Sequence, residues 1–253
     1  MIANHKKLSA LIITLNEEDR IEKLIANLNF ADEIVIIDSY STDNTVAIIK
    51  KHPQVKLIQH RFENFSKQRN FALKQVQNDW VLFIDADEII PESLKLEILN
   101  KLKNPNDCVA FKIFRQFYFK DKPLNYSGWQ TDKVYRVFNR KNVFFEPTKF
   151  VHETLNVNGA SETLKEKLIH FSYNNYSEYK DKMKHYASLR AQELHAKKLK
   201  PNFFHFHIKP LYRFINHYII RLGFLDGKNG YIICKLNAYG VKQRYVALKK
   251  LNS

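Results

Sequence analysis

The sequence predicts an α/β fold, with a mostly parallel central sheet flanked by helices and a C-terminal helical extension. Three observations favour this class. Short β-rich apolar runs alternate with segments of helical periodicity over the first 90 residues, three of these runs end in polar clusters, and the chain after Ser172 has a helical pattern. A length of 253 residues with 45% apolar side chains fits one α/β domain plus a tail and excludes wholesale disorder.

The individual elements follow from hydrophobic periodicity. Strands are predicted at 8–14, 33–37, 55–59 and 80–84, and the helices between them at 17–28, 44–51 and 66–76. Strands separated by helices of this length form parallel pairs through right-handed crossovers. Shorter β-like runs at 109–119, 133–138 and 143–145 predict antiparallel strands added to the same sheet, and 177–198 and 211–222 predict helices.

The net charge of +15 is concentrated in the last third of the chain. Residues 1–160 carry 23 basic and 20 acidic side chains, whereas residues 161–253 carry 18 and 6. Such an excess is typical of a surface that meets a membrane leaflet, a phosphorylated substrate or nucleic acid, although a solvated basic face is the simpler interpretation. We expect no nucleic-acid binding, because no DNA- or RNA-binding signature is present and a carboxylate-rich crevice without a metal repels phosphate.

The compartment is predicted from cysteine usage and hydropathy. Cys108 and Cys234 are too few for a disulfide framework, no run of eighteen apolar residues exists, and the polar N-terminus lacks the apolar region of a signal peptide. These features favour a cytoplasmic protein.

Polar residues follow three of the predicted parallel strands. They lie at 14–17, 38–43 and 85–88, and the carboxyl ends of parallel strands share one edge of a sheet, so we expect one crevice. Asp85 and Asp87 flank Ala86 directly after an apolar strand. Mg²⁺ binds through one or two carboxylates plus substrate phosphates, so this pair is a candidate metal site, although an isolated Asp-x-Asp also occurs in surface turns.

Four ordered motifs carry a family resemblance. LSALIITLNEEDRI, IVIIDSYSTDNT, SKQRNFAL and WVLFIDADE resemble the nucleotide-binding half of family 2 glycosyltransferases, which have the GT-A fold. The resemblance continues more loosely through Trp129, the segment 135–138 and the segment 151–153. The small size and basic tail resemble the subgroup that adds a sugar, often glucose, to the inner core of bacterial lipopolysaccharide.

The resemblance implies a domain organisation and ligands. Residues 1–172 would form the GT-A catalytic domain, with a nucleotide-sugar half at 1–105 and an acceptor half at 106–172, and 173–253 the basic extension. The donor would be a UDP-sugar with Mg²⁺ or Mn²⁺, and the acceptor a lipid-linked or phosphorylated saccharide at the inner face of the plasma membrane.

The resemblance also implies roles for individual residues. The nucleotide would be bound by Thr14, Leu15, Asn16, Glu17, Asp38, Arg69 and Asp85, with Arg136 on the diphosphate. Asp87 would bind the metal directly, with Asp85 nearby and His170 as a third ligand. The alternatives are an exposed helical charge for Arg69, a surface strand-edge arginine for Arg136 and a buried histidine satisfied by backbone for His170.

The general base is predicted less directly. An acceptor hydroxyl must lose a proton as it attacks the anomeric carbon, and a carboxylate opposite the leaving group accepts it. Glu153, in Val151-His152-Glu153, matches a His-Glu element of related enzymes, and Asp132 is the reserve. The Glu-Asp pair usual in the family is absent here in its expected form. The reaction would be a single in-line displacement with inversion.

The aromatic tail is predicted to lie at a membrane surface. On the 211–222 helix an apolar side contains Leu211, Phe214, Ile215, Tyr218, Ile219 and Leu222, and a polar stripe contains Lys209, Arg213, His217 and Arg221. We expect the stripe to face outward toward anionic lipid, with the apolar side packed on the protein or at headgroup depth. His205 and His207 are expected to be surface residues, since nothing completes a zinc site.

Single features discriminate between competing functions. A nucleotidyltransferase would have a glycine-rich loop after the first strand, and Thr14-Leu15-Asn16-Glu17 has none. A glycosyltransferase for another cell-surface polysaccharide or lipid-linked acceptor stays open. A non-catalytic basic protein that binds membrane or nucleic acid is disfavoured by the intact Asp85-Ala86-Asp87.

Overall fold

The computed structural model describes residues 6–120, 122–146, 155–173 and 175–252. The chain divides into two compact units. The first comprises Met1–Arg115 and Lys133–His170, and the second Gln116–Asp132 and Phe171–Ser253. The segment 116–132, expected in the acceptor half, thus belongs with the C-terminal helices.

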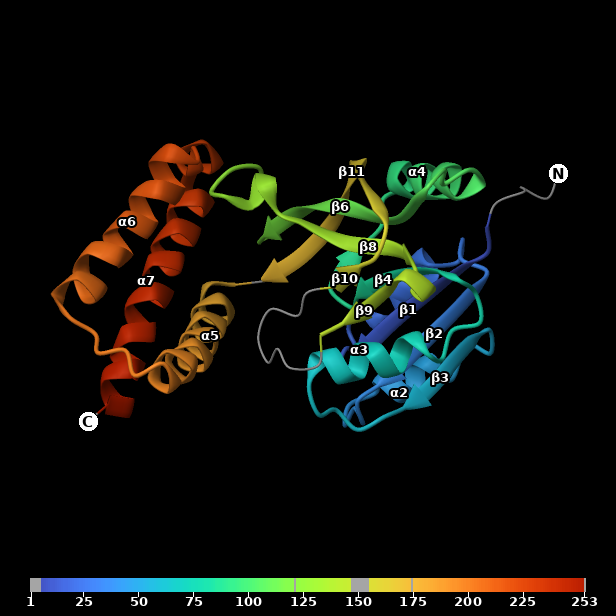
Figure 1. The fold of residues 1–253 in the computed structure, drawn as a ribbon, viewed down its shortest axis with the longest axis horizontal. Coiled ribbons are helices and arrows are strands. Elements are labelled where there is room, and N and C mark those ends of the chain that lie inside the picture. Colours follow the sequence, from blue (N-terminus) through green and yellow to red (C-terminus); the bar gives the residue numbers. More distant parts are fainter. Residues whose placement is uncertain (1–5, 121, 147–154, 174, 253) are drawn as a thin grey trace. The chain divides into compact units, whose positions relative to one another are not determined.

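Four parallel strands form the nucleotide-binding half of the first unit. They are β1 (Leu8–Thr14), β2 (Glu33–Asp38), β3 (Val55–Gln59) and β4 (Trp80–Asp85), in the order β3-β2-β1-β4. The predicted ranges at 8–14 and 55–59 are confirmed, and the other two strands run one residue longer. This order places the strands that end in polar clusters, β2, β1 and β4, side by side (Figure 1).

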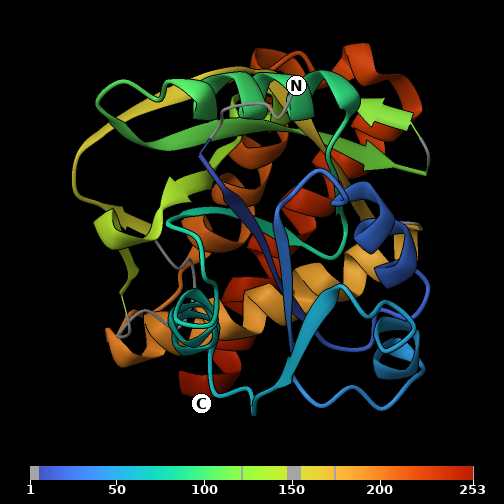
Figure 2. The ribbon, with the colours of Figure 1, turned by 90° about the vertical axis from the view of Figure 1, so that its right-hand side faces the viewer.

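Helices cover both faces of this sheet. One face of β1, with Leu8, Ala10 and Ile12, packs with side chains of α1 (Ile21–Asn27), α2 (Thr45–Ile49) and α4 (Glu92–Lys103). The other face, with Leu11, packs with α3 (Phe65–Leu73). Figure 2 shows α3 on one side of the parallel strands and α1 and α2 on the other. A strand buried on both faces explains the apolar run Ala10–Ile13 at the centre of β1.

Antiparallel strands extend the sheet, as predicted. β8 (Lys133–Asn139) pairs with β4 and with β6 (Cys108–Phe119), and the sheet continues through β11 (Ala160–Tyr173) to β5 (Glu88–Ile89). The run at 143–145, expected in the same sheet, is instead β9 (Val143–Phe145) and forms a separate pair with β10 (Leu155–Val157). The expected α/β fold is therefore confirmed. The β5–β11 pairing matters most for function, because it sets His170 opposite Glu88.

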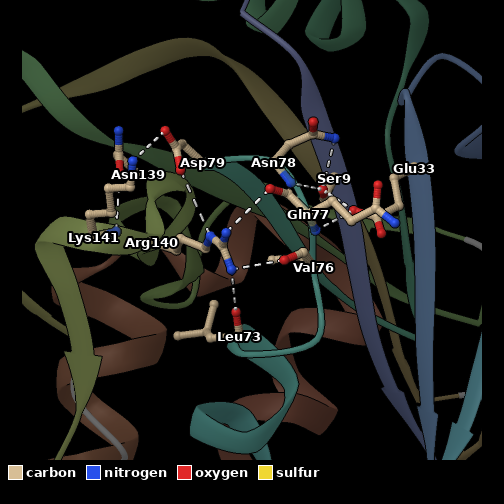
Figure 3. Close-up of polar contacts among 10 residues, drawn as sticks. All are labelled: Ser9, Glu33, Leu73, Val76, Gln77, Asn78, Asp79, Asn139, Arg140 and Lys141. Atoms are coloured by element: carbon tan, nitrogen blue, oxygen red, sulfur yellow. Dashed lines mark hydrogen bonds and ion pairs between the residues drawn. The ribbon is translucent and has the colours of Figure 1, made fainter.

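A hydrogen-bond network links the amino ends of β1, β2 and β4 (Figure 3). The Ser9 hydroxyl donates to Glu33 at 2.5 Å and accepts from the Asn78 amide at 3.1 Å. Arg140 donates to the carbonyl oxygens of Val76 at 2.8 Å and Gln77 at 3.2 Å. The two Arg140 bonds satisfy backbone carbonyl groups of the turn between α3 and β4.

The second unit is mainly helical. It contains β7 (Lys122–Leu124), α5 (Tyr176–Ala196), α6 (Lys209–Ile215) and α7 (Gly227–Asn252). α5 and α6 both pack on α7, around cores that include Tyr179 and Tyr245 (Figure 1). π-helical turns at Phe204–Ile208 and Asn216–Ile220 flank α6, so the helix is unbroken over 204–220. No helix in the described part of the chain is long and apolar enough to span a membrane.

The orientation of the 204–220 helix differs from the prediction. Lys209 and His217, expected on the outward stripe, are half-buried, whereas Leu211, Ile215 and Ile219 are exposed. The cause is polar: Lys209 donates to the Tyr245 hydroxyl at 3.1 Å, and His217 Nδ1 donates to a backbone carbonyl at 2.7 Å. Of the predicted stripe, Arg213 and Arg221 stay exposed.

Candidate functional site

The polar strand ends meet at one edge of the sheet, as expected. Thr14 is in register with Asp38, and Ile13 is in register with Asp85. Thr14 is buried, and its hydroxyl has no hydrogen-bond partner within the described ranges. The edge therefore combines a buried carboxylate, Asp38, with a partly exposed one, Asp85.

The loops after β1 and β2 are tied to each other. The Asn16 amide donates to Ser41 Oγ at 2.8 Å, Asn16 Oδ1 accepts from the Thr42 amide at 2.8 Å, and the Glu17 amide donates to Thr45 Oγ1 at 2.8 Å. Asn16 has a left-handed backbone with φ of 55°, which asparagine tolerates better than most residues. These bonds make a rigid polar rim.

Two apolar side chains project from this rim. Leu15 and Tyr40 are about half exposed, at 52% and 56%. Exposed apolar side chains between two fixed polar loops suit a flat, partly apolar ligand such as a nucleotide base.

Asp38 is fully buried at the end of β2. Its carboxylate accepts from the amide and hydroxyl of Ser41 and from Gln59 Nε2, the last at 3.0 Å. Asp43 caps the next turn by accepting from the Thr45 amide at 3.0 Å. Asp38 and Asp43 thus each accept from a backbone amide two or three residues further along the chain, so both stabilise turns.

Asp85, which is partly exposed, forms a cluster with the buried side chains of Glu88 and Arg136. Arg136 Nη2 donates to Asp85 Oδ2 and, at 2.5 Å, to Glu88 Oε1. Glu88 Oε2 also accepts from the Asp85 amide at 3.1 Å. Glu88 thus holds both the backbone of Asp85 and the arginine that binds its carboxylate. Arg136 lies on β8 between β4 and β6, so the surface strand-edge alternative is wrong.

The charges of this cluster act on its pKa values. Burial raises the pKa of the Asp85 carboxyl, but the Arg136 and Arg69 charges outweigh it and lower that pKa below its usual value. Burial, with the Asp85 charge, raises the pKa of Glu88. Burial lowers the pKa of Arg136, but its two carboxylate partners outweigh burial and raise that pKa above its ordinary value, so Arg136 stays charged.

Arg69 points at the same cluster from α3. Its Nη2 lies 3.6 Å from Asp85 Oδ1, and its guanidinium lies over the rings of Phe83 and Phe145, 5.1 and 5.3 Å from their centroids. Only 16% of the side chain is exposed, so the alternative of an exposed helical charge is wrong.

Asp87 and His170 are brought together by the β5–β11 pairing. Asp87 Oδ2 lies 3.0 Å from His170 Nε2, and both side chains are partly exposed. Burial, reinforced in part by the Asp87 charge, raises the pKa of Glu17, so Glu17 belongs to the same electrostatic environment. The histidine contacts a carboxylate, whereas the alternative interpretation gave it backbone partners.

The fit to a divalent cation rests on two of the three predicted ligands. Asp87 and His170 offer an oxygen and a nitrogen donor at one place, a set that suits Mn²⁺ or Mg²⁺ with phosphate oxygens. Asp85 is held by Arg136 instead. Among the residues that the structure describes, no three His, Cys, Asp or Glu side chains group as a metal site.

The structure describes only one of the two candidate general bases, Asp132. Asp132 follows the short helical turn Trp129–Thr131 in the second unit. Glu153, with Val151 and His152, lies outside the described residues. Its role stays a prediction from the sequence.

Sequence reasoning missed two site residues. In the sequence Glu88 is only the end of a polar cluster, yet its side chain is fully buried. Arg115, at the end of the first unit's part of β6, lies 3.9 Å from Glu88. The sequence does contain a signal for Glu88, because this residue directly precedes the apolar Ile89-Ile90 and is therefore expected to be buried. A buried carboxylate needs a cationic partner.

The family model for glycosyl transferase family 2 matches residues 9–159, and the chain belongs to that family. It is thus a glycosyltransferase, as the resemblance implied.

Relatives extend over nearly the whole chain. It is 29% identical to an uncharacterized glycosyltransferase of Rickettsia bellii, over 98% of this chain and 87% of that protein. It is 27% identical to the lipopolysaccharide core biosynthesis glycosyltransferase LpsC of Rhizobium meliloti, over 96% and 94%. The solved structure of S. aureus TarS 1-349 in complex with UDP aligns over 97% of this chain and 91% of that chain, with 17% identity and a TM-score of 0.49.

Proposed function

We propose that the chain transfers a hexose, glucose in the first instance, from a UDP-sugar to a lipopolysaccharide or lipooligosaccharide core acceptor, with inversion. The observation that carries the proposal is the pairing of Asp87 with His170 beside the Asp85–Arg136 cluster. The acceptor class is supported by LpsC, which is similar over almost its full length. The alternative acceptor is another cell-surface polysaccharide or lipid-linked saccharide.

The donor would lie against the rim made by the loops after β1 and β2. Thr14, Leu15, Asn16, Glu17 and Asp38 would surround the nucleotide, with the exposed Leu15 side chain against the base. Arg69 lies close to Asp85 and supplies positive charge for the phosphates.

Asp87 and His170 would hold Mg²⁺ or Mn²⁺. Such a cation, when bound, neutralises the charge that develops on a departing diphosphate. The protein's own part is positional: Glu88 and Arg136 fix the Asp85 carboxylate next to this pair.

The acceptor hydroxyl would give its proton to Glu153, or to Asp132 if Glu153 lies elsewhere. Attack from the face opposite the leaving diphosphate gives a β-linked product from an α-linked donor. The enzyme would act at the cytoplasmic face of the plasma membrane, where lipid-linked acceptors present their saccharides. The basic second unit supports this location through attraction to anionic lipid.

A thermal-shift screen of nucleotide sugars, with and without Mn²⁺ or Mg²⁺, tests the proposal. A ligand that binds only the folded state at a hundredfold excess over Kd stabilises it by about 2.7 kcal/mol. We expect a metal-dependent rise in Tm with UDP-glucose that exceeds the rise with GDP-mannose. No shift with any UDP-sugar in the presence of metal would contradict the proposed donor.

A further inference from the structure

The 204–220 helix carries a row of apolar side chains on its outward face. Phe204, Ile208, Leu211, Ile215 and Ile219 follow one another at intervals of three or four residues, and all are exposed, Leu211 and Ile219 to 55% each. We call these five residues the apolar row. Further exposed apolar residues flank it: Phe203, Tyr212, Ile220, Leu222, Phe224 and Leu225. An exposed apolar surface of this extent marks an interaction site.

The opposite face of the helix is fixed inside the second unit. His217 Nδ1 donates to the Ser127 carbonyl at 2.7 Å, and Lys209 donates to the Tyr245 hydroxyl at 3.1 Å. Phe214 and Tyr218 also contact the ring of Tyr231, each with a centroid distance of 5.9 Å. Rotation of the helix would break all of these contacts, so the apolar row cannot turn inward.

The charge around the row identifies its partner. Residues 197–253 contain twelve lysines and arginines and a single acidic residue, Asp226. The Asp226 carboxylate accepts from the backbone amides of Asn125 and Tyr126 at 2.9 and 3.0 Å, so it is engaged inside the unit. Arg213 and Arg221 are exposed on the helix itself.

These observations favour a lipid surface over a second copy of the chain. A second copy would bring an equal positive charge against the first, and like charges repel. An anionic bilayer complements both the apolar row and the positive charge around it. Apolar side chains insert at its acyl boundary, and its headgroups attract cations.

We infer that the apolar row is a bilayer-docking surface, inserted at the boundary of headgroups and acyl chains with Arg213 and Arg221 at the level of anionic headgroups. The inference rests on the proposed function, because docking on the bilayer would bring the enzyme to a lipid-linked acceptor. It differs from the expected arrangement, because only Arg213 and Arg221 of the polar stripe are exposed, and exposed apolar residues lie on the helix beside them.

Vesicle co-sedimentation of the full chain tests the inference. The vesicles contain phosphatidylcholine alone or an equal mixture with phosphatidylglycerol. Wild type should bind the anionic vesicles more tightly, and the double variant Leu211→Ser/Ile219→Ser should lose at least about tenfold in partitioning. Leu96→Ser, an equally exposed leucine on α4, should bind as wild type. Equal binding by the double variant, or no wild-type binding, would overturn the inference.

Two further measurements distinguish lipid docking from dimerisation and from misfolding of the double variant. If wild type forms any dimer in sedimentation velocity without vesicles, the double variant should keep it. A wild-type dimer that the double variant loses would instead assign the apolar row to contact with a second copy. Tyr212→Trp should gain fluorescence quenching by brominated lipids, and no added quenching would also overturn the inference, even if the double variant fails to fold. Vesicle binding does not require the nucleotide-sugar donor. The Asp87→Asn variant should therefore bind anionic vesicles as wild type does, even if glycosyl transfer is never detected.

Discussion

Arg136 Nη2 lies 2.5 Å from Glu88 Oε1, and neither side chain has more than 6% of its surface exposed. A buried arginine that faces two carboxylates is stable only while both remain, because each partner compensates the lost hydration of the other. This pair therefore links the stability of the first unit to the position of Asp85.

Glu88→Ala should destabilise the protein severely. It leaves Arg136 with one carboxylate partner and removes the acceptor of the Asp85 amide, so the free energy of unfolding should fall by about 3–5 kcal/mol. Urea unfolding measures the change. Glu88→Gln keeps an oxygen acceptor and should lose less than Glu88→Ala. A loss below about 1 kcal/mol for Glu88→Ala would mean that the cluster is not a structural anchor.

Asp87→Asn should abolish the metal-dependent part of donor binding. The change removes the carboxylate charge beside His170 and keeps the shape of the side chain. In the thermal-shift assay with UDP and Mn²⁺, the variant should keep the Tm of the unliganded wild type and lose the ligand-induced rise. Asp107→Asn, at an exposed aspartate, is the matched control and should respond as wild type. A full rise in the Asp87 variant would remove Asp87 from the metal site.

Glu153→Gln should separate binding from chemistry. The amide cannot accept the acceptor's proton, so transfer should fall about 10²- to 10⁴-fold, while the UDP-sugar thermal shift is retained. Asp132→Asn, measured in parallel, should keep most of the transfer rate. If transfer instead falls in Asp132→Asn and is kept in Glu153→Gln, Asp132 is the general base.

His217 should make stability fall at acidic pH. Burial, together with the Arg213 charge, lowers the pKa of His217 from its ordinary 6.5, and its neutral ring donates to Ser127 and accepts from Arg213. The unfolded chain then binds more protons than the folded one, so stability declines as the pH falls below about 6.5. Urea unfolding from pH 8 to about 5.5 should show a smaller pH dependence in His217→Gln. His185→Gln, on an exposed part of α5, should keep the wild-type slope.

Much of the donor half could be predicted from local sequence. The prediction of β1 matches its observed bounds because a strand buried on both faces carries a mostly apolar run, here LSALIIT. The meeting of Thr14, Asp38 and Asp85 at one edge followed from strand polarity alone. The fourteen-residue strand β11 was missed, because charged residues interrupt the apolar pattern of its sequence ASETLKEKLIHFSY.

The partners of the site residues depend on contacts between distant segments. Arg136 was matched to a phosphate because a guanidinium fits phosphate and carboxylate equally well, and only the β4–β8 pairing brings two carboxylates to it. His170 meets Asp87, 83 residues away along the chain, because β11 is paired with β5.

The sequence by itself determined the fold class, the family and the edge of the sheet that carries the chemistry, because these follow from the order and spacing of residues along the chain. Only the tertiary structure decided which charges pair and which side of the 204–220 helix faces outward. Helical periodicity defines two faces without saying which is buried, and here hydrogen bonds hold Lys209 and His217 of the polar stripe inside the second unit, while Leu211, Ile215 and Ile219 stay exposed.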